Sequence, residues 1–229
     1  MHRQSPIDIC FQNVCYAPEI CRPKINVDYH KGDCHELTTN DHGWMVKAKE
    51  DCRTILTASY LHSKYKLAQF HAHWGHDGTY GSEHLIDGKP FSGEVHFVFW
   101  KMEYGSFDEA TKYDDGLSVI AVFLQEGEYD NIAYEPIVDC VKTALITKGT
   151  VPVPHDFDFN SLLPKLHNFC TYPGSLTTPP YAECVVWTVI KTTVEVSKVQ
   201  LDVFRQIAPS NVRACQEMCD RKVKASSME

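Results

Sequence analysis

Two histidines separated by one residue, His71 and His73, lie in the segment Q-F-H-A-H-W-G, and His96 follows in E-V-H. Side chains alternate between the two faces of a β-strand, so the first two histidines would point to the same side of a strand. His96, on a second strand, would then complete a face of three ring nitrogens around one cation. Three protein ligands with an open fourth position are typical of a catalytic zinc site, whereas structural zinc sites are closed by four ligands.

The surroundings of these histidines favour metal binding over chance. The chain has 12 histidines, so one H-x-H pair can arise by coincidence, and histidines on strands are often surface residues. Here Phe70 and Trp74 flank the pair, and His96 stands among Val95, Phe97, Val98, Phe99 and Trp100. Imidazoles in apolar strands lose hydration and gain nothing in return unless something binds them.

The elements that must position these residues are mostly strands. Segments rich in β-branched and aromatic residues, separated by Gly, Pro, Asn and Asp, predict strands over residues 24–29, 43–49, 65–74, 94–104, 117–125 and 183–194. Helical patterns occur only at residues 131–145 and 197–207. No repeat or linker marks a boundary, so we expect one domain over residues 1–229 with a mixed, mainly β fold.

Composition excludes several classes of function. The 229 residues carry a formal charge of −8, which argues against a nucleic-acid or anionic-membrane surface. No run of about 20 apolar residues is present, so we expect no membrane span. We also expect a monomer.

Ten cysteines leave the compartment open. Their even number suits disulfides in an oxidising compartment, yet the N-terminus lacks the apolar stretch of a signal peptide. We expect a cytoplasmic protein as the sequence stands, or a secreted one if the true N-terminus is missing. Cys34 and Cys52 flank an expected hairpin and could pair; reduced, partly buried thiols are the alternative.

Five blocks, in order over nearly the whole chain, resemble the α-class carbonic anhydrases. They are Q-S-P-I-D-I at residues 4–9, F-H-A-H-W-G at 70–75, G-S-E-H at 81–84, E-V-H-F-V-F-W at 94–100 and Y-P-G-S-L-T-T-P-P at 172–180. The resemblance implies a large, mostly antiparallel, twisted central β-sheet with peripheral short helices and Zn²⁺ at the foot of a conical cleft. His71, His73 and His96 would bind the zinc.

The same resemblance implies the reaction. A zinc-bound hydroxide would hydrate carbon dioxide reversibly to bicarbonate and a proton, since zinc lowers the pKa of its water to about 7 in carbonic anhydrase itself. Small-molecule substrates and sulfonamide-type inhibitors are the implied ligands. Ligating histidines need acceptors that hold the ring, and the family pattern assigns Gln69 to His71, Glu94 to His96 and the Asn211 carbonyl to His73.

Further roles follow from the family pattern for residues that could equally be structural. Thr177 would accept the hydrogen of the hydroxide and donate its own to Glu83, with Thr178 on the substrate side, although this segment in isolation suits a turn. His42 falls on the family's proton-shuttle histidine, and a histidine titrating near neutral pH suits that transfer. The apolar substrate wall, alternatively ordinary core, would comprise Val98, Val119, Leu176, Val185 and Trp187.

The chain departs from the family at its start, because relatives carry a further segment upstream of Q-S-P; relative to them it is N-terminally shortened. Two other classes of function compete with the zinc lyase. One is a catalytically silent binding domain, as in related proteins that have lost a zinc ligand, but His71, His73, His96, Glu83 and Thr177 are all present. The other is a zinc-containing interaction or biomineral-associated module, for which the sequence gives no direct support.

Overall fold

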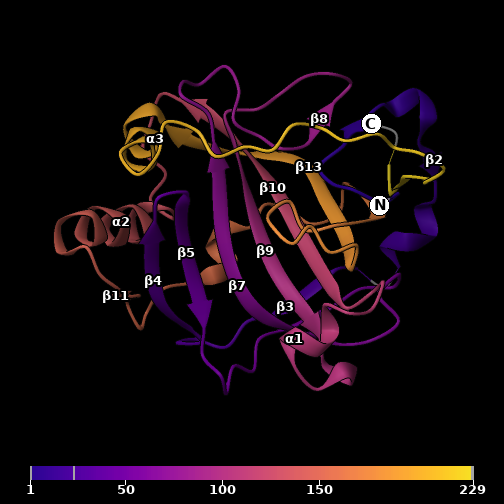
Figure 1. Cartoon of the computed structure of the whole chain (residues 1–229), viewed down its shortest axis with the longest axis horizontal. Helices are drawn as coiled ribbons and strands as arrows, with labels where there is room; N and C mark the ends of the chain where they lie inside the picture. Colours follow the sequence, from indigo (N-terminus) through magenta and orange to yellow (C-terminus); the bar gives the residue numbers. More distant parts are fainter. Residues whose placement is uncertain (1, 23, 228–229) are drawn as a thin grey trace.

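A large β-sheet dominates the computed structural model, which describes residues 2–22 and 24–227 (Figure 1). The strands are β1 (Asp8–Ile9), β2 (Cys15–Tyr16), β3 (Asn26–Asp28), β4 (Cys34–Asn40), β5 (Gly43–Ala48), β6 (Ile55–Thr57), β7 (Tyr65–Trp74), β8 (Leu85–Ile86), β9 (Gly93–Lys101), β10 (Leu117–Gly127), β11 (Val151–Pro152), β12 (Phe169–Gly174), β13 (Val185–Ser197) and β14 (Lys224–Ala225). Within these residues twelve strands form one sheet. Ten of them follow the order β11-β4-β5-β7-β9-β10-β13-β12-β14-β2, while β6 also pairs with β7 and β3 pairs with β6. The short strands β1 and β8 pair separately.

Most neighbouring strands in the sheet are antiparallel, in agreement with the expected fold class. The principal exception is the parallel pair β10–β13, which runs from Leu117 opposite Val185 to Gly127 opposite Ser197. Parallel neighbours need a long connection, and residues 128–184 supply it.

The helices are short and peripheral: α1 (Phe107–Ala110), α2 (Glu135–Thr147) and α3 (Lys198–Arg205), with 3₁₀ turns η1 (Phe11–Asn13), η2 (Pro18–Cys21), η3 (Met102–Tyr104) and η4 (Phe159–Leu162). α3 begins with a capping box at Ser197, the first residue of the predicted helical pattern. Ser197 Oγ accepts the Gln200 N–H, and the Gln200 side chain accepts the Ser197 N–H. No helix in the portion of the chain that the structure describes is long and apolar enough to cross a membrane.

Side-chain alternation sorts the two central strands into a core face and a functional face. On β7, Phe70, Ala72 and Trp74 belong to one apolar cluster, so the odd-numbered residues between them face the other way. On β9, Val95, Phe97 and Phe99 belong to that same cluster, while Val98 belongs to a second cluster across the sheet. His71, His73 and His96 therefore lie on the same face.

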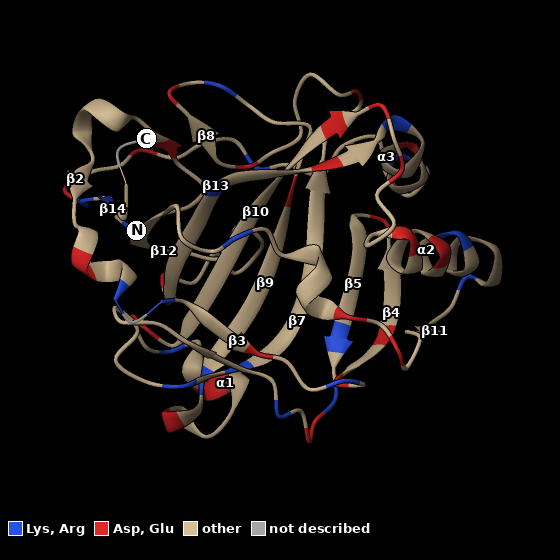
Figure 2. Cartoon of the chain, turned by 180° about the vertical axis from the view of Figure 1, so that it is seen from behind, with Lys and Arg blue, Asp and Glu red and all other residues tan. Residues whose placement is uncertain are grey.

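Several predicted bounds differ from the structure. The strand expected over residues 94–104 ends at Lys101, because η3 follows it directly. The helix expected from residue 131 begins at Glu135, since the Asn131 side chain accepts the Ala133 N–H and forms a turn instead. Charged residues lie mainly in loops, helices and at strand ends, which leaves few of them in the middle of the sheet (Figure 2).

Candidate metal centre

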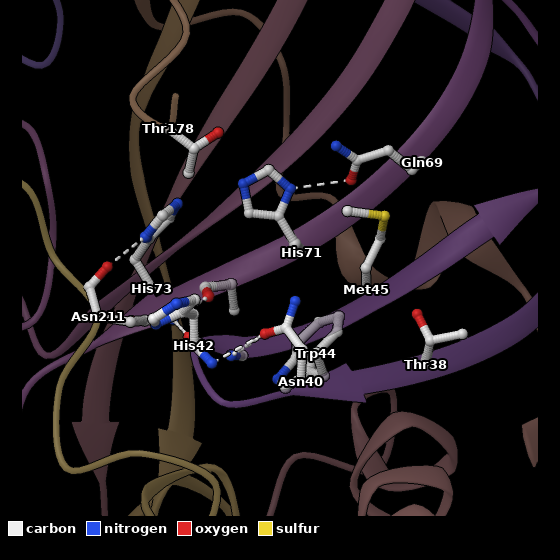
Figure 3. Close-up of a pocket in the computed structure, with 12 residues that line it drawn as sticks. Thr38, Asn40, His42, Trp44, Met45, Gln69, His71, His73, Thr178 and Asn211 are labelled. Carbon is white, nitrogen blue, oxygen red and sulfur yellow. Dashed lines mark hydrogen bonds between the residues drawn. The ribbon is translucent and has the colours of Figure 1, made fainter. Parts of the chain in front are cut away.

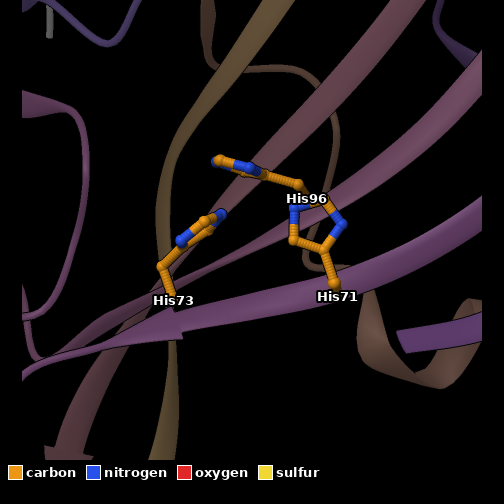
Figure 4. Close-up of side chains that lie close together, drawn as sticks. All are labelled: His71, His73 and His96. Carbon is orange, nitrogen blue, oxygen red and sulfur yellow. The ribbon is translucent and has the colours of Figure 1, made fainter. Parts of the chain in front are cut away.

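Strand register brings the three histidines together. His71 on β7 lies directly opposite His96 on β9, and His73 lies opposite Glu94 one pleat along. The ring centroids are 5.1 Å apart for His71 and His73, 5.3 Å for His71 and His96, and 4.7 Å for His73 and His96. One nitrogen from each ring lies within 4.8 Å of the other two, and the rings converge on one point (Figure 4).

A hydrogen bond on the far side of each ring determines which ring nitrogen remains available to bind a ligand. His71 Nδ1 donates to Gln69 Oε1 at 2.8 Å, and His73 Nδ1 donates to the Asn211 carbonyl at 2.9 Å. His96 Nε2 donates to Glu94 Oε1 at 2.6 Å. Since a carbonyl or carboxylate oxygen only accepts, the proton sits on these nitrogens. Two Nε2 atoms and one Nδ1 atom therefore keep their lone pairs for a ligand.

Burial disfavours the charged form of two of the three rings. Desolvation, and then the neighbouring histidines, hold the pKa of His71 well below its usual value. Desolvation also lowers the pKa of His96, against the opposing attraction of Glu94. The neutral imidazole is the form that binds metal, so the lowered pKa values of His71 and His96 favour binding.

Two buried atoms beside the face lack partners among the residues that the structure describes: His73 Nε2 and Glu83 Oε2. Buried polar atoms are seldom left without a hydrogen-bond partner. An unpaired nitrogen on the converging face therefore indicates that a ligand binds there. Three imidazoles with an open side fit a borderline-soft divalent cation such as zinc. The residues present thus fit the metal that the sequence predicts.

Glu83 lies close behind the metal face but does not bond Thr177 in the described part of the chain. Its Oε1 accepts the Arg213 N–H at 2.9 Å and lies 3.4 Å from His73 Nδ1. Its Oε2 lies 3.9 Å from His96 Nδ1. Thr177 is buried in the segment after β12. The predicted relay therefore has both groups buried, with a free acceptor on Glu83.

A pocket of about 190 Å³ opens onto the metal face (Figure 3). His42 lies exposed at its rim, in the turn between β4 and β5, where its N–H donates to Asn40 Oδ1. Thr178 is exposed on the opposite wall. The lining residues are Thr38, Asn40, His42, Gly43, Trp44, Met45, Gln69, His71, Ala72, His73, Thr178 and Asn211.

The residues predicted to form an apolar substrate wall lie outside this pocket. None of its five members lines this pocket among the described residues. They share the second apolar cluster, in which Val98, Val119, Val185 and Trp187 are buried and Leu176 packs against them. The Trp187 ring nevertheless lies 4.8 Å from the His96 ring. Substrate wall and ordinary core are both compatible with this placement.

The sequence argument missed a buried chain of polar residues behind His96. His84 Nδ1 donates to Glu94 Oε1 at 2.6 Å, and His84 Nε2 lies 2.6 Å from the Tyr172 hydroxyl. The Tyr172 hydroxyl in turn lies 2.9 Å from Ser5 Oγ. All of these residues stand inside the motif blocks, and a histidine next to Glu83 in G-S-E-H was the available signal.

Glu94 is the anchor of that chain. Burial alone would raise its pKa, but attraction to His84 and His96, with their hydrogen bonds, holds it well below the usual value. Its Oε2 also accepts the N–H groups of Glu83 and His84 at 2.9 and 2.8 Å. His84, Glu94 and His96 form a second cluster of potential ligand atoms, but these hydrogen bonds already occupy both His84 nitrogens.

All ten cysteines are free thiols. Cys34 and Cys52 are both buried, and the structure does not form the pairing considered for them. Cys52 Sγ donates instead to Asp33 Oδ2 at 3.3 Å. The alternative of reduced, partly buried thiols is the one that the structure adopts.

The chain resembles known proteins along nearly its whole length. The family model for eukaryotic-type carbonic anhydrases matches residues 1–227. Carbonic anhydrase 5A, mitochondrial, of Rattus norvegicus is 35% identical over 98% of this chain and 77% of the relative. Carbonic anhydrase 7 of Homo sapiens is 35% identical over 98% and 88%, and carbonic anhydrase 1 of Oryctolagus cuniculus is 34% identical over 98% and 99%.

Proposed function

We propose, from the premise that the chain belongs to the eukaryotic-type carbonic anhydrase family, that it uses Zn²⁺ to hydrate carbon dioxide reversibly to bicarbonate and a proton. Membership makes it an enzyme of the carbonic anhydrase class. The observation that carries the zinc proposal is the convergence of three histidine nitrogens within 4.8 Å of one another.

His71, His73 and His96 would hold the zinc, with Gln69, the Asn211 carbonyl and Glu94 fixing the rings. When bound, zinc acts as a Lewis acid and lowers the pKa of water, so that water becomes a nucleophile near neutral pH. Neutral ligands suit this role, because anionic ones would diminish the positive charge of the metal.

Thr177 and Glu83 would orient the attacking water. A threonine hydroxyl can accept the hydrogen of that water while it donates its own hydrogen to a carboxylate. Glu83 Oε2 is the acceptor left free for this bond in the described structure. Carbon dioxide is apolar, and Val98, Val119, Leu176, Val185 and Trp187 offer it an apolar surface near His96, with Thr178 at the mouth.

His42 would carry the released proton to buffer. It is exposed at the rim of the pocket that His71 and His73 line, so it can exchange protons with solvent on one side and with pocket water on the other. Imidazole can take up and release a proton near neutral pH, which suits transfer in both directions.

The test measures zinc per chain together with carbon dioxide hydration and its inhibition by an aromatic sulfonamide. We expect one zinc, hydration and inhibition. The variant His73→Ala should lose zinc and hydration, whereas His62→Ala, at an exposed histidine outside the pocket, should keep both. Stoichiometric zinc without hydration would leave a metal site and refute the enzyme mechanism; zinc-free protein would refute both.

A catalytically silent binding domain is the competing function, and the presence of all three histidines, Thr177 and Glu83 speaks against it. We also propose that residues 1–229 form one domain and act as a monomer, which sedimentation can test.

A further inference from the structure

The turn that carries His42 extends beyond the strand pairing that holds β5 to β7. The ladder between these strands comprises Met45 opposite His71, Val46 opposite Phe70 and Lys47 opposite Gln69. It stops at Met45, so the tip of the β4–β5 hairpin runs alongside residues 72–74 without ladder bonds to them. The position of His42 relative to the metal face must therefore be set by something else.

The side chain of Asn211 fills this gap. Its Nδ2 donates to the His42 carbonyl at 2.9 Å and to the Ala72 carbonyl at 3.0 Å, so one amide group joins the hairpin tip to β7. Its Oδ1 accepts the Trp74 N–H at 2.8 Å. Two carbonyls facing one end and an N–H facing the other leave a single orientation of the amide that satisfies every partner.

The backbone of Asn211 is held in the same place. Its N–H donates to the Trp74 carbonyl at 3.2 Å, and its own carbonyl accepts from His73 Nδ1 at 2.9 Å. Packing is also close, because a Cβ added at Gly43 would lie 3.1 Å from Asn211 Nδ2. One residue thus supports a metal ligand through its backbone and the His42 turn through its side chain.

We propose that the Asn211 side chain is a positioning residue that couples the metal face to the His42 turn. Metal binding would order the His73 ring, and through it the Asn211 carbonyl and the amide that holds the turn. The turn would in turn place the proton carrier. This inference rests on the proposed function for its consequence in catalysis, but the coupling itself depends only on metal binding.

Asparagine is the side chain that this junction needs. Aspartate has the same shape and can still accept the Trp74 N–H, but it would face two carbonyls with an oxygen and lose both donors. Asn211→Asp therefore cuts the bonds to His42 and Ala72 while it leaves the backbone carbonyl available to His73. Serine is too short to span the junction and adds no charge.

The test compares amide hydrogen exchange of residues 42–44 in metal-free and zinc-loaded protein. In the unaltered chain zinc should slow exchange in this turn, and in Asn211→Asp the zinc-dependent part of that protection should be lost. Zinc release to a chelator should quicken by roughly tenfold or more, within the range for supporting residues. Hydration at low buffer concentration should fall several-fold, with recovery on addition of imidazole.

A matched control and a second variant keep the test decisive. Asn160→Asp introduces the same change at an exposed asparagine in η4 and should leave all three measurements unaltered. If Asn211→Asp does not fold, as judged by circular dichroism, Asn211→Ser provides the same comparison. Zinc-dependent protection that persists in the Asn211 variant, or that is missing in the unaltered chain, would overturn the coupling. A chain that couples zinc to the turn but hydrates no carbon dioxide would refute only the proposed function.

Discussion

Glu94 Oε1 accepts a hydrogen bond from His96 Nε2 at 2.6 Å, across a spacing of two residues on a single strand. The period of the strand places both side chains on one face, so the acceptor and the ligand are positioned by the same backbone. His96 is therefore committed to presenting Nδ1, whereas His71 and His73 present Nε2.

Glu94→Gln should weaken zinc binding about 10- to 100-fold, because a neutral amide gives the His96 ring a poorer acceptor. The glutamine amide also has only one accepting oxygen, whereas two backbone N–H groups and His84 donate hydrogen bonds to the two oxygens of Glu94. Competition with a chelator of known affinity measures the change. Glu109→Gln, at a half-buried helix position far from the metal face, is the control, and equal affinities for the two variants would show that Glu94 does not support the ligand.

His42→Ala should slow hydration mainly at low buffer concentration, since the proton then lacks a carrier at the rim of the pocket. Added imidazole should restore turnover. Stopped-flow hydration over a series of buffer concentrations checks this, with His62→Ala as the exposed-histidine control. Turnover that does not respond to the loss of His42 at any buffer concentration would remove it from the mechanism.

Thr177→Val keeps the shape of the side chain and removes the hydroxyl. If Thr177 orients the attacking water against Glu83, kcat/KM should fall on the order of 10²-fold. Zinc content should stay the same, because Thr177 is not a proposed ligand. Thr143→Val, on the exposed face of α2, controls for general effects of the substitution. An unchanged kcat/KM would assign the segment to a turn alone.

Asp33→Asn should reduce the free energy of unfolding by about 1–3 kcal/mol at pH 7. Asp33 Oδ2 accepts hydrogen bonds from Thr54 Oγ1 at 2.7 Å and from the N–H groups of Arg53 and Thr54 at 2.8 Å. Burial opposes ionisation, but these bonds, with that from Cys52, lower the pKa of Asp33 below 3.8.

The sign of the pH effect follows from that lowered pKa. The folded state binds this proton less readily than the unfolded state, so the stabilisation is present above pH 3.8 and is lost as the pH falls through the folded pKa. The difference between the unaltered chain and Asp33→Asn should therefore shrink in acid. Urea unfolding at several pH values measures it, and a difference that grows as the pH falls would contradict the argument. Asp156→Asn is the exposed control.

Cys34 and Cys52 should resist alkylation in the folded protein, whereas exposed Cys15 and Cys219 should react. Burial raises the pKa of Cys34 to about 12 and that of Cys52 to about 11, and the thiolate is the reactive form. Mass mapping of peptides after iodoacetamide treatment without reductant shows which of these cysteines are alkylated. A peptide linked through Cys34 and Cys52 would show instead that they pair in solution.

The sequence predicts best where a strand is long and apolar. The bounds of β7, Tyr65–Trp74, are those predicted from its aromatic content. The segment C-H-E-L-T-T-N gave no such signal, yet it forms β4, because its partners β5 and β11 supply the pairing and only Cys34 and Leu37 face the core. A strand specified by its neighbours is invisible to a local pattern.

For the candidate site, too, the sequence predicts what local strand geometry determines and misses what distant partners determine. Histidines two residues apart on a strand predict a shared face, and the structure places His71 and His73 on it. The tautomers of His71 and His96 depend on Gln69 and Glu94, two residues away, whereas that of His73 depends on Asn211, which is 138 residues away. The role of His84 likewise depends on a distant partner, Tyr172, which lies 88 residues from it. The bridge through the Asn211 side chain was equally hidden, since its two acceptors are backbone carbonyls and carry no sequence signature.

The support for the proposed metal ligands emerges from the ribosome long after the ligands themselves. His73 and its Asn211 acceptor are 138 residues apart, and the Arg213 N–H that bonds Glu83 is 130 residues away from it. All three histidines are synthesised before the segment that completes their surroundings. Because such distant contacts form slowly, the nascent chain would expose its histidines without a finished site. Metal loading should accordingly wait until the segment around Asn211 has emerged and packed against the histidine strands.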